Sequence, residues 1–129
     1  SVTWNKTRTA DSSYAAFRNY MNLVFSYCGT RSMNNEVQAI AAKDVQPGDV
    51  LHQTGNPYGH AVTVMDVAID SAGNKVVMLS QSYMPAQNIH ILKNPTKPKL
   101  SPWYILNDNA ATQTPEWTFP AGSLKRWKN

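Results

Sequence analysis

The chain has one cysteine, Cys28, among its 129 residues, so no disulfide can form within it. A small disulfide-stapled fold is therefore excluded, although a single cysteine does not identify the redox compartment. No apolar run reaches the roughly 20 residues that a membrane-spanning helix needs, and no signal peptide is recognisable. These absences predict a globular chain without a membrane-spanning segment.

Charged residues are also scarce, at 16% of the chain against 42% hydrophobic residues, which excludes intrinsic disorder. The length suits a single domain over residues 1–129. The net charge of +4 comes from scattered Lys and Arg, with one small cluster over 125–128. Such mild basicity favours a solvated surface, and no nucleic-acid partner is predicted. Because the first residue is Ser1 and not methionine, we expect the chain to be a piece of a longer protein.

The richest stretch runs from Gly48 to Gln87 and reads as three strands with two connections. We predict strands over 49–53, 60–69 and 75–83, an irregular loop over 54–59 and a tight turn over 70–74. The β-branched residues of 60–69 predict a strand buried on both faces. His60 opens this strand directly after Gly59, a position in which a catalytic imidazole can be presented at the rim of a sheet.

The residues before this stretch predict helices. Apolar side chains recur at spacings of three and four over 12–28, which indicates one apolar helix face: Tyr14, Phe17, Met21, Val24, Phe25 and Cys28. Asp11 or Ser12 is expected to cap the start of this helix, and Gly29 to end it in a left-handed conformation. A second helix is expected from Ser32 to about Ala42.

The residues after Gln87 predict shorter elements. Strands are expected over 88–92 and 116–119, separated by a proline-rich surface loop over 93–102 and the apolar residues 103–106. The order of helices followed by antiparallel strands predicts an α+β fold, with the helices packed on one side of a central antiparallel sheet. The helix over 12–28 is expected to bury Phe17, Met21, Val24 and Phe25 against that sheet.

The three histidines do not form a metal-binding pattern. His52 and His60 are separated by a Gly/Pro loop, His90 lies far along the chain, and no cysteine or carboxylate pair completes a familiar ligand spacing. We therefore predict neither a metal nor another cofactor.

A cysteine-histidine couple is the sharper hypothesis for His60. A histidine base needs a thiol within reach and a polar side chain that fixes its tautomer. The return strand offers Gln81, Tyr83 and Gln87, which share the face of His60 if the turn has even length. A two-residue turn would put Pro85 opposite His60 and leave Gln81 about 13 Å further along the strand from that position. Gln81 therefore requires a longer loop or a bulge, and Gln87 requires a strand that continues past Pro85, so both orienters stay open.

The thiol in this chain fits the nucleophile's role poorly. Cys28 falls at the C-terminal end of the predicted helix, where the helix dipole disfavours a thiolate and the apolar stripe would bury the sulfur. We expect Cys28 to be a core cysteine and not the nucleophile. The four tryptophans, Trp4, Trp103, Trp117 and Trp127, could line a groove but are more typical of core or rim positions.

Several motifs resemble known families. The segments PGDV (47–50), GHAV (59–62) and SQSY (80–83) look like the second half of CHAP and NlpC-type domains, the papain-like peptidases and amidases of bacterial cell walls. The strings QSYMPAQ, LKNP, SPWY, TPEWTF and GSLKRW resemble the C-terminal part of an uncharacterised bacterial family of secreted or envelope proteins. In these families the nucleophilic cysteine opens a helix upstream of the histidine strand.

The resemblance implies half of a papain-like hydrolase. His60 would be the base and Gln81 or Gln87 its orienter, the nucleophile would lie in an upstream segment of the parent protein, and the chain alone would be inactive. The substrate would be a cell-wall peptide or a related amide, and the location the bacterial envelope or the exterior. The alternative is a non-catalytic module that uses the same scaffold to hold a peptide or glycan.

Overall fold

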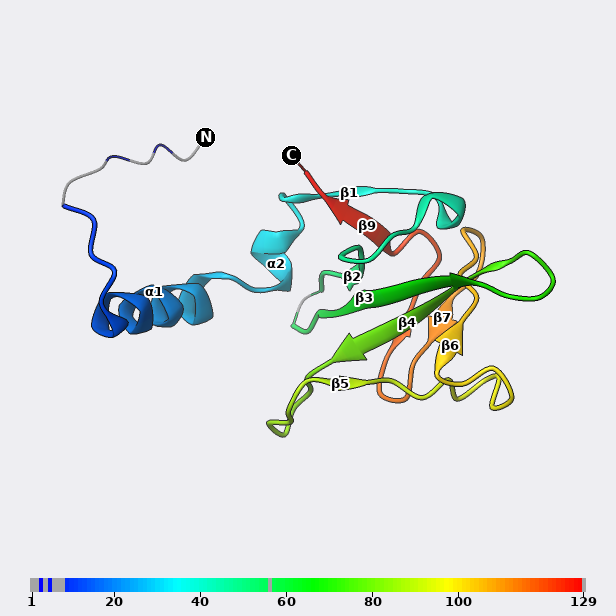
Figure 1. Cartoon of the computed structure of the whole chain (residues 1–129). Coiled ribbons are helices and arrows are strands. Elements are labelled where there is room, and N and C mark those ends of the chain that lie inside the picture. The colour runs from blue at the N-terminus through cyan, green and yellow to red at the C-terminus, as the bar shows by residue number, and fades with distance from the viewer. Residues whose placement is uncertain (1–2, 4, 6–8, 56, 129) are drawn as a thin grey trace.

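A computed structural model describes residues 3, 5, 9–55 and 57–128. The fold is α+β, as predicted, with short helical segments followed by antiparallel strands (Figure 1). The helical elements are α1 (Tyr14–Tyr27), α2 (Thr30–Met33) and a 3-10 turn, η1 (Ala42–Asp44). The strands are β1 (Val37–Ala39), β2 (Val50–Gln53), β3 (His60–Ile69), β4 (Lys75–Gln81), β5 (His90–Ile91), β6 (Trp103–Tyr104), β7 (Thr112–Gln113), β8 (Thr118–Phe119) and β9 (Leu124–Trp127).

One sheet organises the molecule, with the strand order β1-β9-β2-β3-β4-β5 and β6 paired to β4. All its pairs are antiparallel. The strand β9 lies between β1 and β2, although the sequence predicted only a basic end there. Arg126 of β9 explains this placement in part, because its guanidinium makes a bidentate ion pair with the buried Asp49 at 2.7 and 2.9 Å.

The hairpin β3–β4 has an irregular register that decides which side chains share a face. Ile69 pairs with Lys75 around the loop 70–74, and Asp66 pairs with Met78. After a bulge between Val64 and Asp66 the register shifts, so that Thr63 pairs with Ser80. Continued by one step, this register sets Gln81 opposite Val62 and on the same face as His60.

The hydrophobic core lies between the sheet and the segments that follow β6. Buried residues of the central strands form one cluster with Tyr104 and Phe119, and Leu106 and Trp117 pack against it. The small ribbon β7–β8 therefore covers the sheet face that the sequence assigned to a helix. The prediction that β3 is buried on both faces is wrong, because Met65 and Ile69 are exposed.

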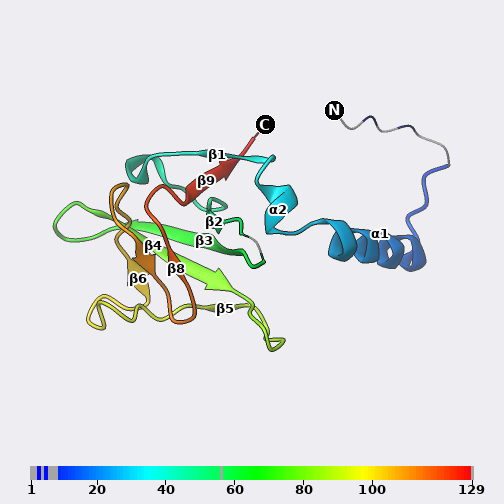
Figure 2. The ribbon, with the colours of Figure 1, turned by 180° about the vertical axis from the view of Figure 1, so that it is seen from behind.

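The helix α1 forms where it was predicted but does not pack on the sheet. Ser13 caps it by accepting a hydrogen bond from the backbone N–H of Ala16, one residue after the expected Ser12. None of its described residues is buried, Phe25 is 72% exposed, and the helix projects away from the sheet in both views (Figures 1 and 2). Helical periodicity revealed an apolar face but not the surface that covers it.

The connection from α1 to the sheet also differs from the prediction. Gly29 has an extended conformation and starts α2, so the left-handed cap is wrong. The expected helix from Ser32 to Ala42 is reduced to the single turn α2, and Ser32 lies inside it with its hydroxyl accepting from the Gly29 N–H. Val37 instead belongs to β1 and pairs with Trp127, because β-branched residues also suit a strand position.

Candidate active site

His60 opens β3 at the end of the hairpin beside α2. The glycine before it is required by space: a Cβ on Gly59 would lie 2.5 Å from the Gln53 carbonyl oxygen and 2.6 Å from the Thr30 hydroxyl oxygen. Such distances are too short for any side chain, so the chain can reach the position of His60 only through glycine. The glycine that precedes His60 therefore has a structural cause in the close approach of Gln53 and Thr30.

Gln81 lies next to the His60 imidazole. Its side-chain Oε1 is 2.7 Å from Nε2 of His60, and the glutamine is buried at the last position of β4. The bulge in β3 makes this contact possible, because without it the loop 70–74 would place Gln81 on the opposite face. Gln87, the other candidate orienter, makes no hydrogen bond to His60 within the described part of the chain, but it lines the adjacent cleft.

Glu116 fixes the orientation of the Gln81 amide. Its Oε2 is 2.7 Å from Nε2 of Gln81, and a carboxylate can only accept a hydrogen bond. The amide NH₂ must therefore face Glu116, which turns Oε1 towards His60. Since Oε1 is an acceptor, the network assigns the imidazole proton to Nε2 and leaves Nδ1 with its lone pair.

Nδ1 is the nitrogen available for proton transfer. Among the described residues it has no hydrogen-bond partner. It is also not one of their two enclosed and unpaired side-chain atoms, which belong to His52 and Ser80. A histidine held by one nitrogen, with the other left open, has the geometry of a general base.

Three aromatic rings lie close to the His60 imidazole. Tyr83 meets it edge-on at 5.1 Å between centroids, Trp117 is tilted at 5.4 Å, and Phe119 is stacked at 5.9 Å. Trp117 is itself held, because its indole N–H donates to the side chain of Gln53. The imidazole is thus clamped in one orientation by packing as well as by Gln81.

A cleft of about 470 Å³ adjoins His60. Among the described residues, no Asp, Glu, Lys or Arg lines it; the lining residues are Tyr58, Gly59, His60, Ser82, Tyr83, Met84, Ala86, Gln87 and Trp117. The volume and the mixture of aromatic and uncharged polar groups suit a small ligand or a short polymer segment. Of the four tryptophans, Trp117 lies in this cleft, Trp103 and Trp127 lie in strands, and Trp4 is outside the described residues.

The other histidines have separate partners. Nε2 of the buried His52 is 2.7 Å from the Thr30 carbonyl oxygen, and Nδ1 of the exposed His90 is 2.9 Å from the Asn88 carbonyl oxygen. Over residues 9–55 and 57–128, no three His, Cys, Asp or Glu side chains gather as a metal site requires. No helix in the same ranges is long and apolar enough to cross a membrane.

Cys28 is exposed, and the expectation that it belongs to the core is wrong. It ends α1, and because no described residue of that helix is buried, the sulfur is not enclosed by the apolar stripe. No hydrogen bond joins Cys28 to His60 within the described ranges. The structure therefore does not assemble a cysteine-histidine couple from these two residues.

Sequence reasoning missed Glu116. The residue was assigned to a short strand, whereas it precedes β8 in the turn that Thr114 closes by a hydrogen bond to the Trp117 carbonyl. The one sequence feature that could have pointed to Glu116 as a site residue is its place beside Trp117, which puts a carboxylate next to a large aromatic residue. Its partner Gln81 could not be inferred, because the two residues are far apart in the sequence.

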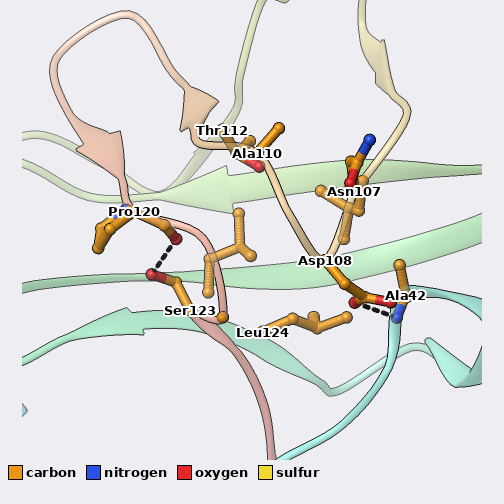
Figure 3. Close-up of a pocket in the computed structure, with 11 residues that line it drawn as sticks. Ala42, Asn107, Asp108, Ala110, Thr112, Pro120, Ser123 and Leu124 are labelled. Carbon is orange, nitrogen blue, oxygen red and sulfur yellow. Dashed lines mark hydrogen bonds between the residues drawn. The ribbon is translucent and has the colours of Figure 1, made fainter.

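A second pocket lies between η1 and the segments 106–112 and 120–124 (Figure 3). Two hydrogen bonds join residues drawn there: Asp108 accepts from the Ala42 N–H, and Ser123 donates to the Pro120 carbonyl. At about 10 Å³ it holds no more than one water molecule, so it offers no ligand site.

A family described as "Domain of unknown function (4846)" matches residues 1–126. No curated protein and no solved structure matches the chain.

Proposed function

The chain belongs to the family described as Domain of unknown function (4846), and we propose that it carries the base half of a bacterial cell-wall cysteine peptidase or amidase. What supports the proposal is the series of contacts Glu116–Gln81–His60, with two distances of 2.7 Å. A side-chain amide that holds one nitrogen of a histidine, while the other nitrogen has no hydrogen-bond partner and the residue lines a cleft, is an arrangement suited to activating a nucleophile.

In the proposed reaction, Nδ1 of His60 takes the proton of a thiol as the sulfur attacks an amide carbon. The resulting imidazolium returns the proton to the leaving nitrogen, so His60 acts first as base and then as acid. Gln81 keeps Nε2 protonated and the ring in place throughout. The nucleophile is supplied by an upstream segment of the parent protein, since Cys28 is not bonded to His60. The substrate is a cell-wall peptide, and the site of action is the envelope or the exterior.

Amide cleavage by the full-length parent protein tests this proposal. The His60→Ala variant should lose cleavage of cell-wall peptides by a factor of about 10² to 10⁴ because the general base is gone. His90→Ala is the matched control, since His90 is exposed and outside the cleft. The chain on its own should show no hydrolysis. Undiminished cleavage by His60→Ala would remove His60 from the mechanism.

Two further variants of the parent separate the candidate orienters. Gln81→Ala should lower kcat more than Gln87→Ala, because only Gln81 contacts the imidazole. Gln87→Ala should change KM more than kcat, as expected of a residue that lines the cleft. The reverse result would make Gln87 the orienter.

The alternative function is a non-catalytic module that holds a peptide or glycan. The observation in its favour is the cleft itself, where Tyr58, Tyr83 and Trp117 offer aromatic surface. This reading requires the chain alone to bind a wall peptide or glycan and the full-length parent to leave that ligand intact. Tryptophan fluorescence of the wild type and of Trp117→Leu would measure the binding.

A further inference from the structure

The helix α1 presents a wide apolar surface that nothing in the described structure covers. Helical geometry places Tyr20, Leu23 and Tyr27 beside the stripe of Phe17 and Phe25, so apolar side chains span more than half of the circumference. The exposed fractions are 74% for Tyr14, 54% for Phe17, 61% for Tyr20, 48% for Leu23, 72% for Phe25 and 74% for Tyr27. So many large exposed side chains on one element mark an interaction surface.

The helix also needs a partner in order to be stable. It has 14 residues, and isolated helices of this length are marginal in water because nucleation is costly. The N-cap at Ser13 supplies only part of the free energy that a stable helix requires. The remainder must come from burial of the apolar face, as it does for most protein helices.

We propose that a second copy of the chain covers α1, through an antiparallel pairing of the two α1 helices. Arg18 is the only charged residue of the helix, so two copies can approach without repulsion between like charges along the apolar face. The five exposed aromatic residues would bury about 150–250 Å² each if they became fully enclosed, and since they are 54–74% exposed they offer on the order of 600 Å² per copy. That approaches the roughly 800 Å² per partner of a standard interface, before Leu23 is included.

The position of α1 favours the antiparallel arrangement. The helix projects from the body of the molecule (Figures 1 and 2), so a second helix can lie along it without a collision between the two sheets. Each copy of the chain carries a net charge of +4, and antiparallel pairing puts the two bodies at opposite ends of the helix pair. The interface is then isologous and closes as a dimer.

Sedimentation velocity of the whole chain tests the pairing. Over a hundredfold range of concentration up to about 0.5 mM, the 14.4 kDa chain should pass from monomer to dimer, as expected of an interface at the small end of the range. A chain that stays monomeric over this range would overturn the proposal and favour a different segment as the partner of α1.

A charged substitution locates the interface. Phe25→Glu should weaken the dimer at least about tenfold, because it puts a carboxylate into the apolar contact while glutamate remains a good helix former. The matched control is Ile69→Glu, which places the same charge on another exposed apolar position, at the far end of β3. A dimer that Phe25→Glu leaves intact would place the interface elsewhere.

The single cysteine reports the orientation of the pair. Cys28 ends α1 and is exposed, so a spin label can be attached there without mutation. For antiparallel helices in contact, the two Cys28 Cα atoms should be about 24 Å apart, from the helical rise and the usual interaxial spacing. A disulfide-linked dimer, or labels in direct contact, would rule out the antiparallel pairing.

Discussion

At the scale of single residues, Glu116 has the largest effect for its position, because it determines which nitrogen of His60 carries the proton. Within the described structure it makes no hydrogen bond to the imidazole and does not line the cleft, and it is linked to His60 through the Gln81 amide. Glu116 is therefore a positioning residue. A carboxylate suits this role better than an amide because it cannot donate and so leaves Gln81 one orientation.

Replacing Glu116 with Gln should release that constraint. Gln81 could then turn its amide over, and the wild-type Nε2–H tautomer of His60 should give way to a mixture of both tautomers. The ¹⁵N chemical shifts of the imidazole measure this directly in the chain alone, with Glu36→Gln as the control. An unchanged tautomer in Glu116→Gln would show that packing by Tyr83 and Trp117 alone orients the ring.

Tyr104 should make the fold sensitive to alkaline pH. Burial, and secondarily the charge of Glu116, raise the pKa of its hydroxyl from 10.0 to about 12, and the hydroxyl donates to the Lys93 carbonyl. Because the unfolded chain releases this proton first, the contribution is complete below pH 10 and is lost as the pH rises towards 12.

The measurement is the urea midpoint at pH 8, 10 and 11. Tyr104→Phe should lower the free energy of unfolding by about 0.5–1.5 kcal/mol at pH 8 through the lost hydrogen bond. Between pH 8 and pH 11 the variant should then lose less stability than the wild type. Tyr58→Phe, at an exposed tyrosine, should follow the wild type. Parallel curves for Tyr104→Phe and wild type would assign the alkaline loss to other groups.

At the scale of elements, the sheet and α1 should respond very differently to truncation. Leu79 of β4 is fully buried in the core cluster, so Leu79→Ala should lower the free energy of unfolding by about 2–5 kcal/mol. Phe25→Ala should change it by no more than about 0.5 kcal/mol in dilute monomer, because Phe25 is largely exposed. A large loss from Phe25→Ala in monomer would mean that α1 packs on the body after all.

The positions of the main helix and the central strands were largely predictable from the sequence, whereas the register between the strands was not. Alternation, turn residues and caps identified α1, β2, β3 and β4 to within two residues. The bulge between Val64 and Asp66 has no local signal, since Met65 is an ordinary strand residue. Yet this bulge selects the face of Gln81, so the choice between Gln81 and Gln87 could not be made from sequence spacing.

At the scale of the whole molecule, the sequence predicted the class of fold but not how its parts meet. The α+β arrangement and the antiparallel hairpin followed from the order of the elements. The segments that pack on the sheet could not be inferred in this way, because Phe119 and Leu106 come from stretches that read as loops or short strands. Glu116 became part of the site for the same reason: only the folded ribbon β7–β8 brings it to Gln81.

The central place of β9 has a consequence for synthesis on the ribosome. Residues 124–127 pair with both β1 and β2, so among the described strands β1 has no partner and β2 is paired only with β3 until translation has passed nearly every other element. A nascent chain that lacks these residues carries two open strand edges and an uncovered Asp49, features that invite pairing with other chains. Release of β9 from the exit tunnel should thus be the step at which the nascent polypeptide becomes able to close its sheet.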